Sequence, residues 1–208
     1  MAYGDFDLEK LQKEFDLVEE RAWLFDKVVD VEPTEWLKET LRRSQTLAVV
    51  SEKARSEMLV TPILLEARQL NQERFAIYSG TVLDADKEKG LSGECDFILT
   101  DTPPRHTLQA PIITLVEAKK QDIERYLGQC AAQMLGARVF NQTHQNPVET
   151  IFGCVTTGEA WQFLKLDGLT IYVDLNRYYI NQVGQILGAL QAVFNFYISD
   201  SPFESSDG

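Results

Sequence analysis

The fold that we expect is decided by Gly93-Glu94-Cys95-Asp96-Phe97-Ile98-Leu99 and, after a loop, by Ile112-Ile113-Thr114-Leu115-Val116-Glu117-Ala118-Lys119-Lys120. Each half carries an apolar run with the length and the β-branched or aromatic content of a buried strand. The prolines and polar residues of 101–106 predict a loop between two adjacent strands. Because side chains alternate across a strand, Glu117 and Lys119 point to one face and Ala118 to the other. Antiparallel pairing would bring Asp96 close to both charges.

Two carboxylates and an ammonium at the rim of a sheet are typical of a site for a metal ion and a water molecule. Mg²⁺ prefers oxygen ligands, which Asp96, Glu117 and the Ala118 carbonyl would supply. Lys119 would hold a water or help to deprotonate it, and would offset charge in a phosphoryl-transfer transition state. Taken alone, the tripeptide 117–119 favours a plainer interpretation, a solvated strand end with an ordinary Glu/Lys pair.

Length and composition indicate one globular domain. The chain has 208 residues, 44% hydrophobic and 25% charged, which suffices for a full hydrophobic core. Its three cysteines show no paired spacing and predict reduced, buried thiols of a cytoplasmic protein. No signal peptide and no long apolar span is visible, so we expect no membrane partner.

Residues 1–48 predict an N-terminal helical extension packed on the core. We expect an amphipathic helix within 5–25 and a second helix over 35–47. The residues at helical spacing in the first segment are Leu8, Leu11, Phe15 and Val18. An apolar patch around Trp23, Phe25 and Trp36 needs a partner, which is either the body of the domain or a second subunit. A homodimer through these helices is therefore one interpretation.

Residues 49–198 predict an α/β domain with a mixed central β-sheet flanked by helices. A helix over 49–71 should be kinked or divided at Pro62, which lacks an amide hydrogen. Glu57 in this segment lies either at the boundary of a solvated face or against a polar site. The further elements expected are strands at 74–83, 150–157, 161–166 and 169–175 and helices at about 122–140 and 181–197. We expect the polar tail 199–208 to be disordered.

The helix expected at 122–140 carries two glutamines four residues apart. Gln129 and Gln133 are therefore neighbours on one strip of a mostly apolar helix. They would line a polar cleft or lie on a half-exposed boundary face, and the spacing does not choose between these alternatives.

The order of these motifs resembles the PD-(D/E)XK superfamily of nucleases, also called restriction-endonuclease-like. The resemblance rests on Gly93-x-x-Asp96, on a strand ending in Glu117-Ala118-Lys119, and on the following helix with its glutamines. The segment Thr156-Thr157-Gly158-Glu159-Ala160-Trp161-Gln162-Phe163 is similar to the corresponding part of the nuclease domain of type I restriction subunits. The resemblance covers roughly 51–166. One departure is Cys95, which stands where the family's name has proline.

The resemblance implies a restriction-endonuclease-like core and Mg²⁺- or Mn²⁺-dependent hydrolysis of phosphodiester bonds in nucleic acid, with DNA as the expected partner. Asp96, Glu117 and the Ala118 carbonyl would bind the metal, and Lys119 would position the attacking water. Glu57, on the helix ahead of the first strand, would bind a second ion or a metal-bound water. The remaining implied residues are Gln129 or Gln133, which would orient Lys119 or contact the scissile strand, and Lys120 and Arg125, which would contact neighbouring phosphates.

Net charge favours a second hypothesis of a different class. The chain carries a net charge of −12, whereas phosphate neutralisation by Lys and Arg supplies most of the affinity of nucleic-acid-binding proteins. A nuclease-like fold without catalysis would then act as a protein-binding or regulatory module, with the acidic N-terminal segment docking a partner. The intact set Glu57, Asp96, Glu117 and Lys119 opposes this alternative, because a silent site has no chemical reason to keep all four.

Overall fold

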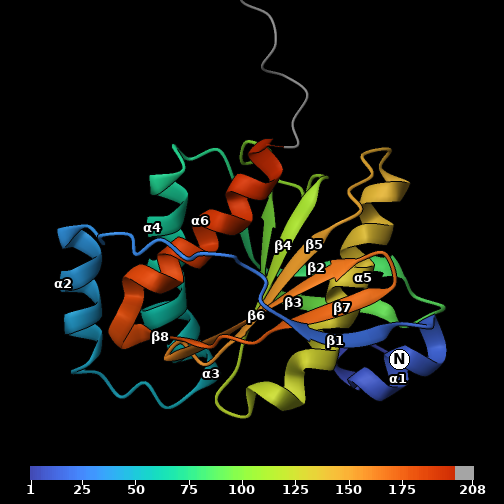
Figure 1. Cartoon of the computed structure of the whole chain (residues 1–208), viewed down its shortest axis with the longest axis horizontal. Coiled ribbons are helices and arrows are strands. Elements are labelled where there is room, and N and C mark those ends of the chain that lie inside the picture. Colours follow the sequence, from blue (N-terminus) through green and yellow to red (C-terminus); the bar gives the residue numbers. More distant parts are fainter. Residues whose placement is uncertain (200–208) are drawn as a thin grey trace, which may run out of the picture.

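A computed structural model gives the structure of the chain, and it describes residues 1–199. These residues form an open mixed β-sheet with helices on both sides (Figure 1). The strand order is β1-β7-β6-β5-β4-β3-β2, and β8 pairs with the end of β6. The strands are β1 Val18–Ala22, β2 Ala76–Asp86, β3 Leu91–Thr100, β4 Ile112–Ala118, β5 Ile151–Thr156, β6 Ala160–Asp167, β7 Thr170–Asp174 and β8 Tyr178–Tyr179.

The pairing directions bring several strand ends to one edge of the sheet. β4 and β5 are parallel, as are β1 and β7, and the other pairs are antiparallel. The carboxyl ends of β1, β4, β5 and β7 therefore lie at the same edge. We call it the carboxyl edge; α3 and β8 lie along it at the bottom of Figure 1.

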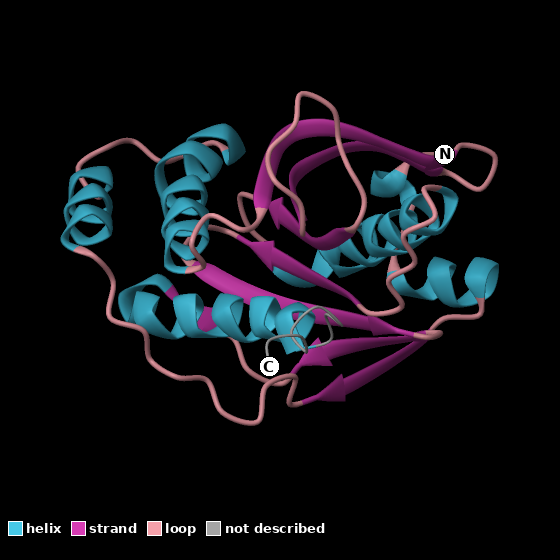
Figure 2. Cartoon of the chain, turned by 90° about the horizontal axis from the view of Figure 1, so that it is seen from above, coloured by secondary structure: helices cyan, strands magenta, loops and turns pink. Residues whose placement is uncertain are grey.

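Helices cover the two faces of the sheet unequally, as Figure 2 shows from above. One face packs against α2, α4 and α6, and the opposite face packs against α5, with α1 beyond it. The helices are η1 Tyr3–Asp5, α1 Leu8–Phe15, α2 Glu35–Ser44, α3 Glu52–Arg55, η2 Ser56–Val60, α4 Thr61–Leu70, η3 Ile123–Tyr126, α5 Leu127–Thr143, η4 Ile180–Gln182 and α6 Val183–Ser199.

Two apolar clusters separated by the sheet form the core. In the first, Phe75 stacks on Phe194 of α6 at 4.3 Å between ring centroids. The Tyr197 hydroxyl of α6 donates toward the carbonyls of Ile113 and Thr150, both 2.9 Å away. The second cluster joins α5 to the other face and includes the buried thiols of Cys95 and Cys130. The expected mixed sheet flanked by helices is thus confirmed.

The N-terminal segment differs from the expected helical extension. Helix α1 ends at Phe15, Asp16 takes a left-handed conformation (φ 55°), and 18–22 form the edge strand β1 beside β7. The prediction of one helix within 5–25 is therefore wrong at Val18, whose helical spacing is coincidental. Glu19, Glu20 and Arg21 are exposed charges of the kind that protect an edge strand from further pairing.

The predicted apolar patch is divided by the fold. The ring of Phe25 packs into the domain, stacked on Phe152 and edge-on to Phe163. Trp23 and Trp36 stay 63% and 49% exposed. The body of the domain is therefore the partner of Phe25.

The helical segment before β2 is irregular near Pro62, where we expected a kink or a division. The backbone stays helical through α3, η2 and α4, and the π-helical turn η2 lies directly before Pro62, where the amide of Thr61 bonds to the Ser56 carbonyl five residues back. At the other end of the chain, α6 extends to Ser199, the first residue of the expected disordered tail. Residues 200–208 of that tail lie outside the described residues. Within 1–199 no helix is both long and apolar enough to cross a membrane.

Candidate functional site

The candidate site forms where β3 and β4 separate. Their ladder runs from Thr100 and Ile112 to Phe97 and Val116, and the next two residues are Asp96 and Glu117. The backbone amide of Ala118 donates to the Asp96 carboxylate (N to Oδ2 2.7 Å), so a side chain takes the place of a ladder bond. On its other side β4 stays paired with β5. The sheet therefore opens only between β3 and β4, and the side chains of Asp96 and Glu117 lie at this opening, which we call the fork.

Side chains from α5 hold Glu117 in the fork. Its carboxyl group is 2% exposed and accepts hydrogen bonds from the amide groups of Gln129 and Gln133 (Gln133 Nε2 to Oε2 2.8 Å). Gln133 is fully buried, and its Oε1 meets no donor among residues 1–199. The two glutamines thus converge on a buried acid, and the burial of Gln133 excludes a half-exposed boundary position for that residue.

Burial dominates the electrostatics of both carboxylates. It raises the pKa of Glu117, and the neighbouring Asp96 charge raises it further, while Lys119 and Gln133 oppose the shift. Burial also raises the pKa of Asp96, opposed by the Ala118 amide and by Lys119. Two partly desolvated carboxylates beside each other favour protons or a cation between them.

Lys119 contributes a cation to this cluster. Its Nζ lies 2.6 Å from Glu117 Oε1 and 4.8 Å from the centre of the Tyr126 ring. Burial lowers the pKa of Lys119, but the charges of Glu117, Asp96 and Glu52 outweigh it, so the net shift is upward. Lys119 is therefore an ammonium at neutral pH, suited to orient a water or stabilise negative charge and not to act as a base.

The structure places Glu57 outside this cluster. Its side chain is 53% exposed and lies 3.8 Å from Lys53 Nζ on the surface of η2. Glu52, in the first turn of α3, is exposed, but its charge is close enough to the site to raise the pKa of both Asp96 and Lys119. The sequence signal for Glu52 was Ser51, which caps this helix through its side chain and sets the residues that follow at the start of a helix.

Arg55 is a second residue that the sequence analysis did not single out. Its Nη1 donates to the Thr157 carbonyl (2.8 Å) at the end of β5, and Glu159 lies 3.5 Å away. Its Nε is buried and meets no acceptor within the described part of the chain. No sequence signal marks this residue, because its role depends on the contact between α3 and the β5–β6 turn.

The predicted substrate contacts Lys120 and Arg125 lie beside the site on the surface. Both are exposed, and the Arg125 guanidinium lies 6.0 Å from the Tyr126 ring centre, on the side chain that also contacts Lys119. Lys120 follows β4 and Arg125 lies in η3, and no contact of either with Asp96 or Glu117 is present in the described residues.

The donor set fits a hard divalent cation. It consists of oxygens from Asp96, Glu117 and the Ala118 carbonyl, and Mg²⁺ and Mn²⁺ prefer such ligands. In the described residues, no group of three or more His, Cys, Asp or Glu side chains converges as metal ligands. A bound ion would therefore have to take most of its ligands from the backbone, water and substrate phosphate, which is common for Mg²⁺.

Comparison of the chain with models of protein families, with curated proteins and with solved structures found no match. The argument for function therefore depends on the residues of this site.

Proposed function

We propose that the chain is a metal-dependent nuclease that hydrolyses phosphodiester bonds in nucleic acid, with DNA as the first substrate to test. The observation that carries the proposal is the fork between β3 and β4, where the buried Glu117 carboxylate, the half-buried Asp96 carboxylate and the Lys119 ammonium lie close together. A strand pair, a helix bearing glutamines and a parallel strand beyond it support the resemblance to the PD-(D/E)XK superfamily and its restriction-endonuclease-like core.

Each residue of the fork has a role in this proposal. Asp96, Glu117 and the Ala118 carbonyl would hold Mg²⁺ or Mn²⁺, which when bound polarises a phosphoryl oxygen and lowers the pKa of a water. The Lys119 ammonium orients the attacking water and stabilises charge on the phosphate as the bond breaks. Gln129 and Gln133 keep the Glu117 carboxylate in one orientation. In place of Glu57, we assign Glu52 to support a second ion or an ion-bound water.

One observation favours the alternative of a silent binding module. Both oxygens of Glu117 already accept hydrogen bonds from the protein, so the site is largely satisfied by its own side chains. The net charge of −12 also opposes binding to long stretches of duplex. The paired acids oppose this alternative, because burial and mutual repulsion cost stability that a purely structural fork would not need.

The deciding experiment removes one charge from the fork and leaves its shape. Glu117→Gln should lower the affinity for Mg²⁺ and Mn²⁺ in calorimetric titration. It should also reduce cleavage of supercoiled and single-stranded DNA by about 10²–10³-fold, as loss of one group that stabilises transition-state charge does elsewhere.

Glu149→Gln is the matched control, because Glu149 is an exposed glutamate just before β5, at the opposite edge of the sheet. It should bind metal and cleave like the wild type. A wild-type chain that neither binds metal nor cleaves would overturn the nuclease proposal and leave the binding module.

A further inference from the structure

A second feature of the carboxyl edge is a cleft beside the candidate site. Its volume of about 510 Å³ is large enough for a nucleotide base with its sugar. It lies between the ends of β1 and β7, the short strand β8 and the first turn of α6. Its lining residues are Trp23, Phe25, Asp26, Val28, Asn176, Arg177, Tyr178 and Gln185.

The strand register connects this cleft to the candidate site. Glu117 is paired with Val155 and Val155 with Gln162, so the three residues form a row across β4, β5 and β6. The Gln162 side chain then accepts hydrogen bonds from Arg177 (Nε 3.3 Å, Nη2 3.2 Å). Two strand spacings place Gln162 about 10 Å from Glu117 along the row. This corresponds to about three nucleotides of a stacked strand.

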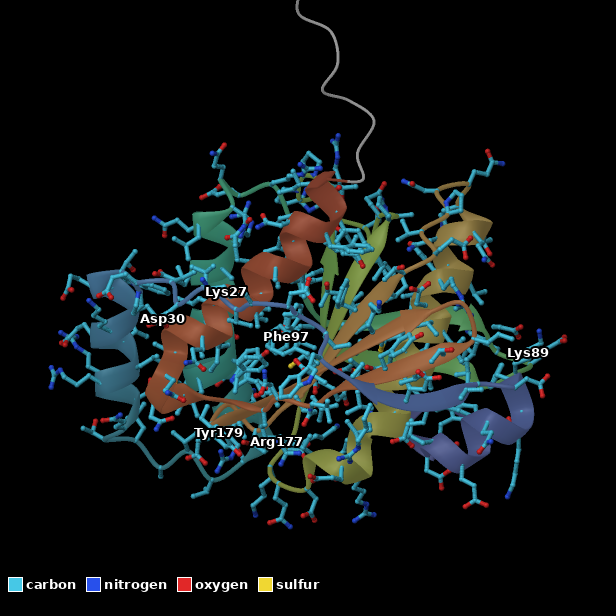
Figure 3. The ribbon with its side chains drawn as sticks, in the orientation of Figure 1. Lys27, Asp30, Lys89, Phe97, Arg177 and Tyr179 are labelled. Atoms are coloured by element: carbon cyan, nitrogen blue, oxygen red, sulfur yellow. The ribbon has the colours of Figure 1, made fainter. Side chains whose placement is uncertain are left out.

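Arg177 is held in one orientation at this position. Its Nη2 lies 2.6 Å from Glu124 of η3, and its side chain remains 31% exposed. Figure 3 shows Arg177 beside Tyr179 at the carboxyl edge. An anchored and partly exposed guanidinium is suited to contact a phosphate.

The cleft also has an aromatic rim over a rigid floor. Trp23 lines the cleft and is 63% exposed, so its indole ring is accessible for stacking. Below it, the rings of Phe25 and Tyr178 are both packed edge-on against Phe163. Asn176 and Gln185 add amide groups that can donate and accept hydrogen bonds.

We propose that this cleft receives a nucleotide of single-stranded nucleic acid that continues from the catalytic fork. A base stacks on Trp23 and the adjacent phosphate contacts Arg177. The cleavage of that strand rests on the proposed nuclease function, but the binding does not.

Charge and geometry favour a single strand over a duplex. Duplex binding depends on many Lys and Arg contacts to phosphates, whereas this chain has a net charge of −12 and Asp26 lines the cleft. Stacking on an aromatic side chain needs no excess of cations and accepts any base. Bases inside a duplex are stacked on each other and cannot reach Trp23.

The test measures binding without hydrolysis, in EDTA, by fluorescence anisotropy of labelled oligo-dT, oligo-U and a duplex of equal length. Trp23→Ala should weaken binding of a single strand about tenfold, while Trp23→Phe should restore most of the affinity because it keeps a ring for stacking. Arg177→Gln should weaken binding and reduce its dependence on salt. The DNA and RNA arms show which strand the cleft prefers.

Trp36→Ala and Arg42→Gln are matched controls, because both residues are exposed on α2 away from the cleft. They should bind like the wild type. The proposal that the cleft binds a single strand would be contradicted if Trp23→Ala and Arg177→Gln both bound with wild-type affinity. It would also be contradicted if the wild type bound the duplex more tightly than either single strand. If binding depends on Trp23 but the chain never cleaves nucleic acid, the proposed binding site would be supported and the proposed nuclease activity would be contradicted.

Discussion

Two buried carboxylates at the carboxyl edge show how differently the same group can be used. Glu117 is the penultimate residue of β4 and Asp174 is the last residue of β7, and the two residues are 2% and 4% exposed. Burial raises the pKa of both. Their surroundings differ, because Glu117 meets a second acid, a lysine and two glutamines, whereas Asp174 meets backbone amides and a tyrosine.

The hydrogen bonds of Asp174 connect separate segments of the chain. Its Oδ1 accepts from the amides of Leu24 (3.5 Å) and Asn176 (3.0 Å), and its Oδ2 accepts from the Tyr178 hydroxyl (3.2 Å). These contacts join the ends of β1, β7 and β8. None of these donors carries a charge, so the contacts require an acceptor oxygen but not a negative charge.

Glu117, in contrast, has a charged partner. Its partners include an ammonium, and it lies beside Asp96 at the point where two strands separate. The comparison teaches that burial and a raised pKa alone do not identify a functional acid. The nature of its partners does: uncharged donors indicate a structural role, and a second acid with a cation indicates a site.

The largest expected difference that tests this comparison is the one between Asp174→Asn and Glu117→Gln in cleavage. In Asp174→Asn, the amide oxygen can still accept from both backbone amides, and its NH₂ group can donate to the Tyr178 oxygen. We expect cleavage within about twofold of the wild type, in contrast to the 10²–10³-fold loss in Glu117→Gln. Asp174→Ala leaves buried donors unsatisfied and should cost about 2 kcal/mol. Its melting temperature should then fall by about 4–8 °C.

Calorimetric melting and a cleavage assay on the same preparations measure both quantities. A loss of cleavage in Asp174→Asn equal to that in Glu117→Gln would show that the two acids act alike, and the comparison would fail.

A smaller effect sharpens the description of the site. Glu52→Gln should reduce cleavage about tenfold, since it removes a charge that acts on both Asp96 and Lys119. Glu57→Gln is its matched control on the same helical segment and should cleave like the wild type. Both rates are measured at saturating Mg²⁺ on one substrate. The reverse ranking would return the role to Glu57 and exclude Glu52.

The smallest effect is a dependence of stability on pH. Burial raises the pKa of Asp174 above its ordinary value of 3.8, so the folded state binds its proton more tightly than the unfolded state. Between those two pKa values stability falls as pH rises, and the contribution of the protonated form is lost. Asp174→Asn has no carboxyl group at this position, so this pH-dependent contribution to stability is absent from it. Its stability relative to the wild type should therefore improve as pH rises.

Urea unfolding of both proteins between about pH 4 and pH 7 measures this difference, because all other titrating groups are shared. A difference that is constant across the range, or that changes in the other direction, would contradict the raised pKa.

Much of the fold could be predicted from the periodicity of the sequence. The strands around Asp96 and Glu117, the helix with Gln129 and Gln133 and the final helix all carry long apolar patterns of one period. The edge strand β1 could not be predicted in this way, because Val18–Ala22 is mostly charged and forms a strand only by pairing with β7. The two-residue strand β8 is likewise defined only by its contact with β6.

The site could be predicted in part for the same reason. Asp96, Glu117 and Lys119 follow from adjacent strands and alternating side chains, which are local properties. Glu52 could not be separated from Glu57, because Glu57 lies in a π-helical turn, whose side-chain directions differ from those of the α-helix that the sequence predicts. Arg55 and Arg177 depend on contacts with the β5–β6 turn and with β6, which are distant in sequence.

The sequence by itself determined the apolar strands and helices, the acids at the end of two neighbouring strands and the excess of negative charge. The periodicity of apolar side chains and the composition are properties of short segments, so they can be recognised without knowledge of the fold. Only the tertiary structure decided that α5 covers Glu117, that Asp174 connects the ends of β1, β7 and β8 by hydrogen bonds, and that Trp23 and Arg177 line the same cleft. Each of these facts depends on which strands pair and in which register, and pairing joins segments that no local pattern connects.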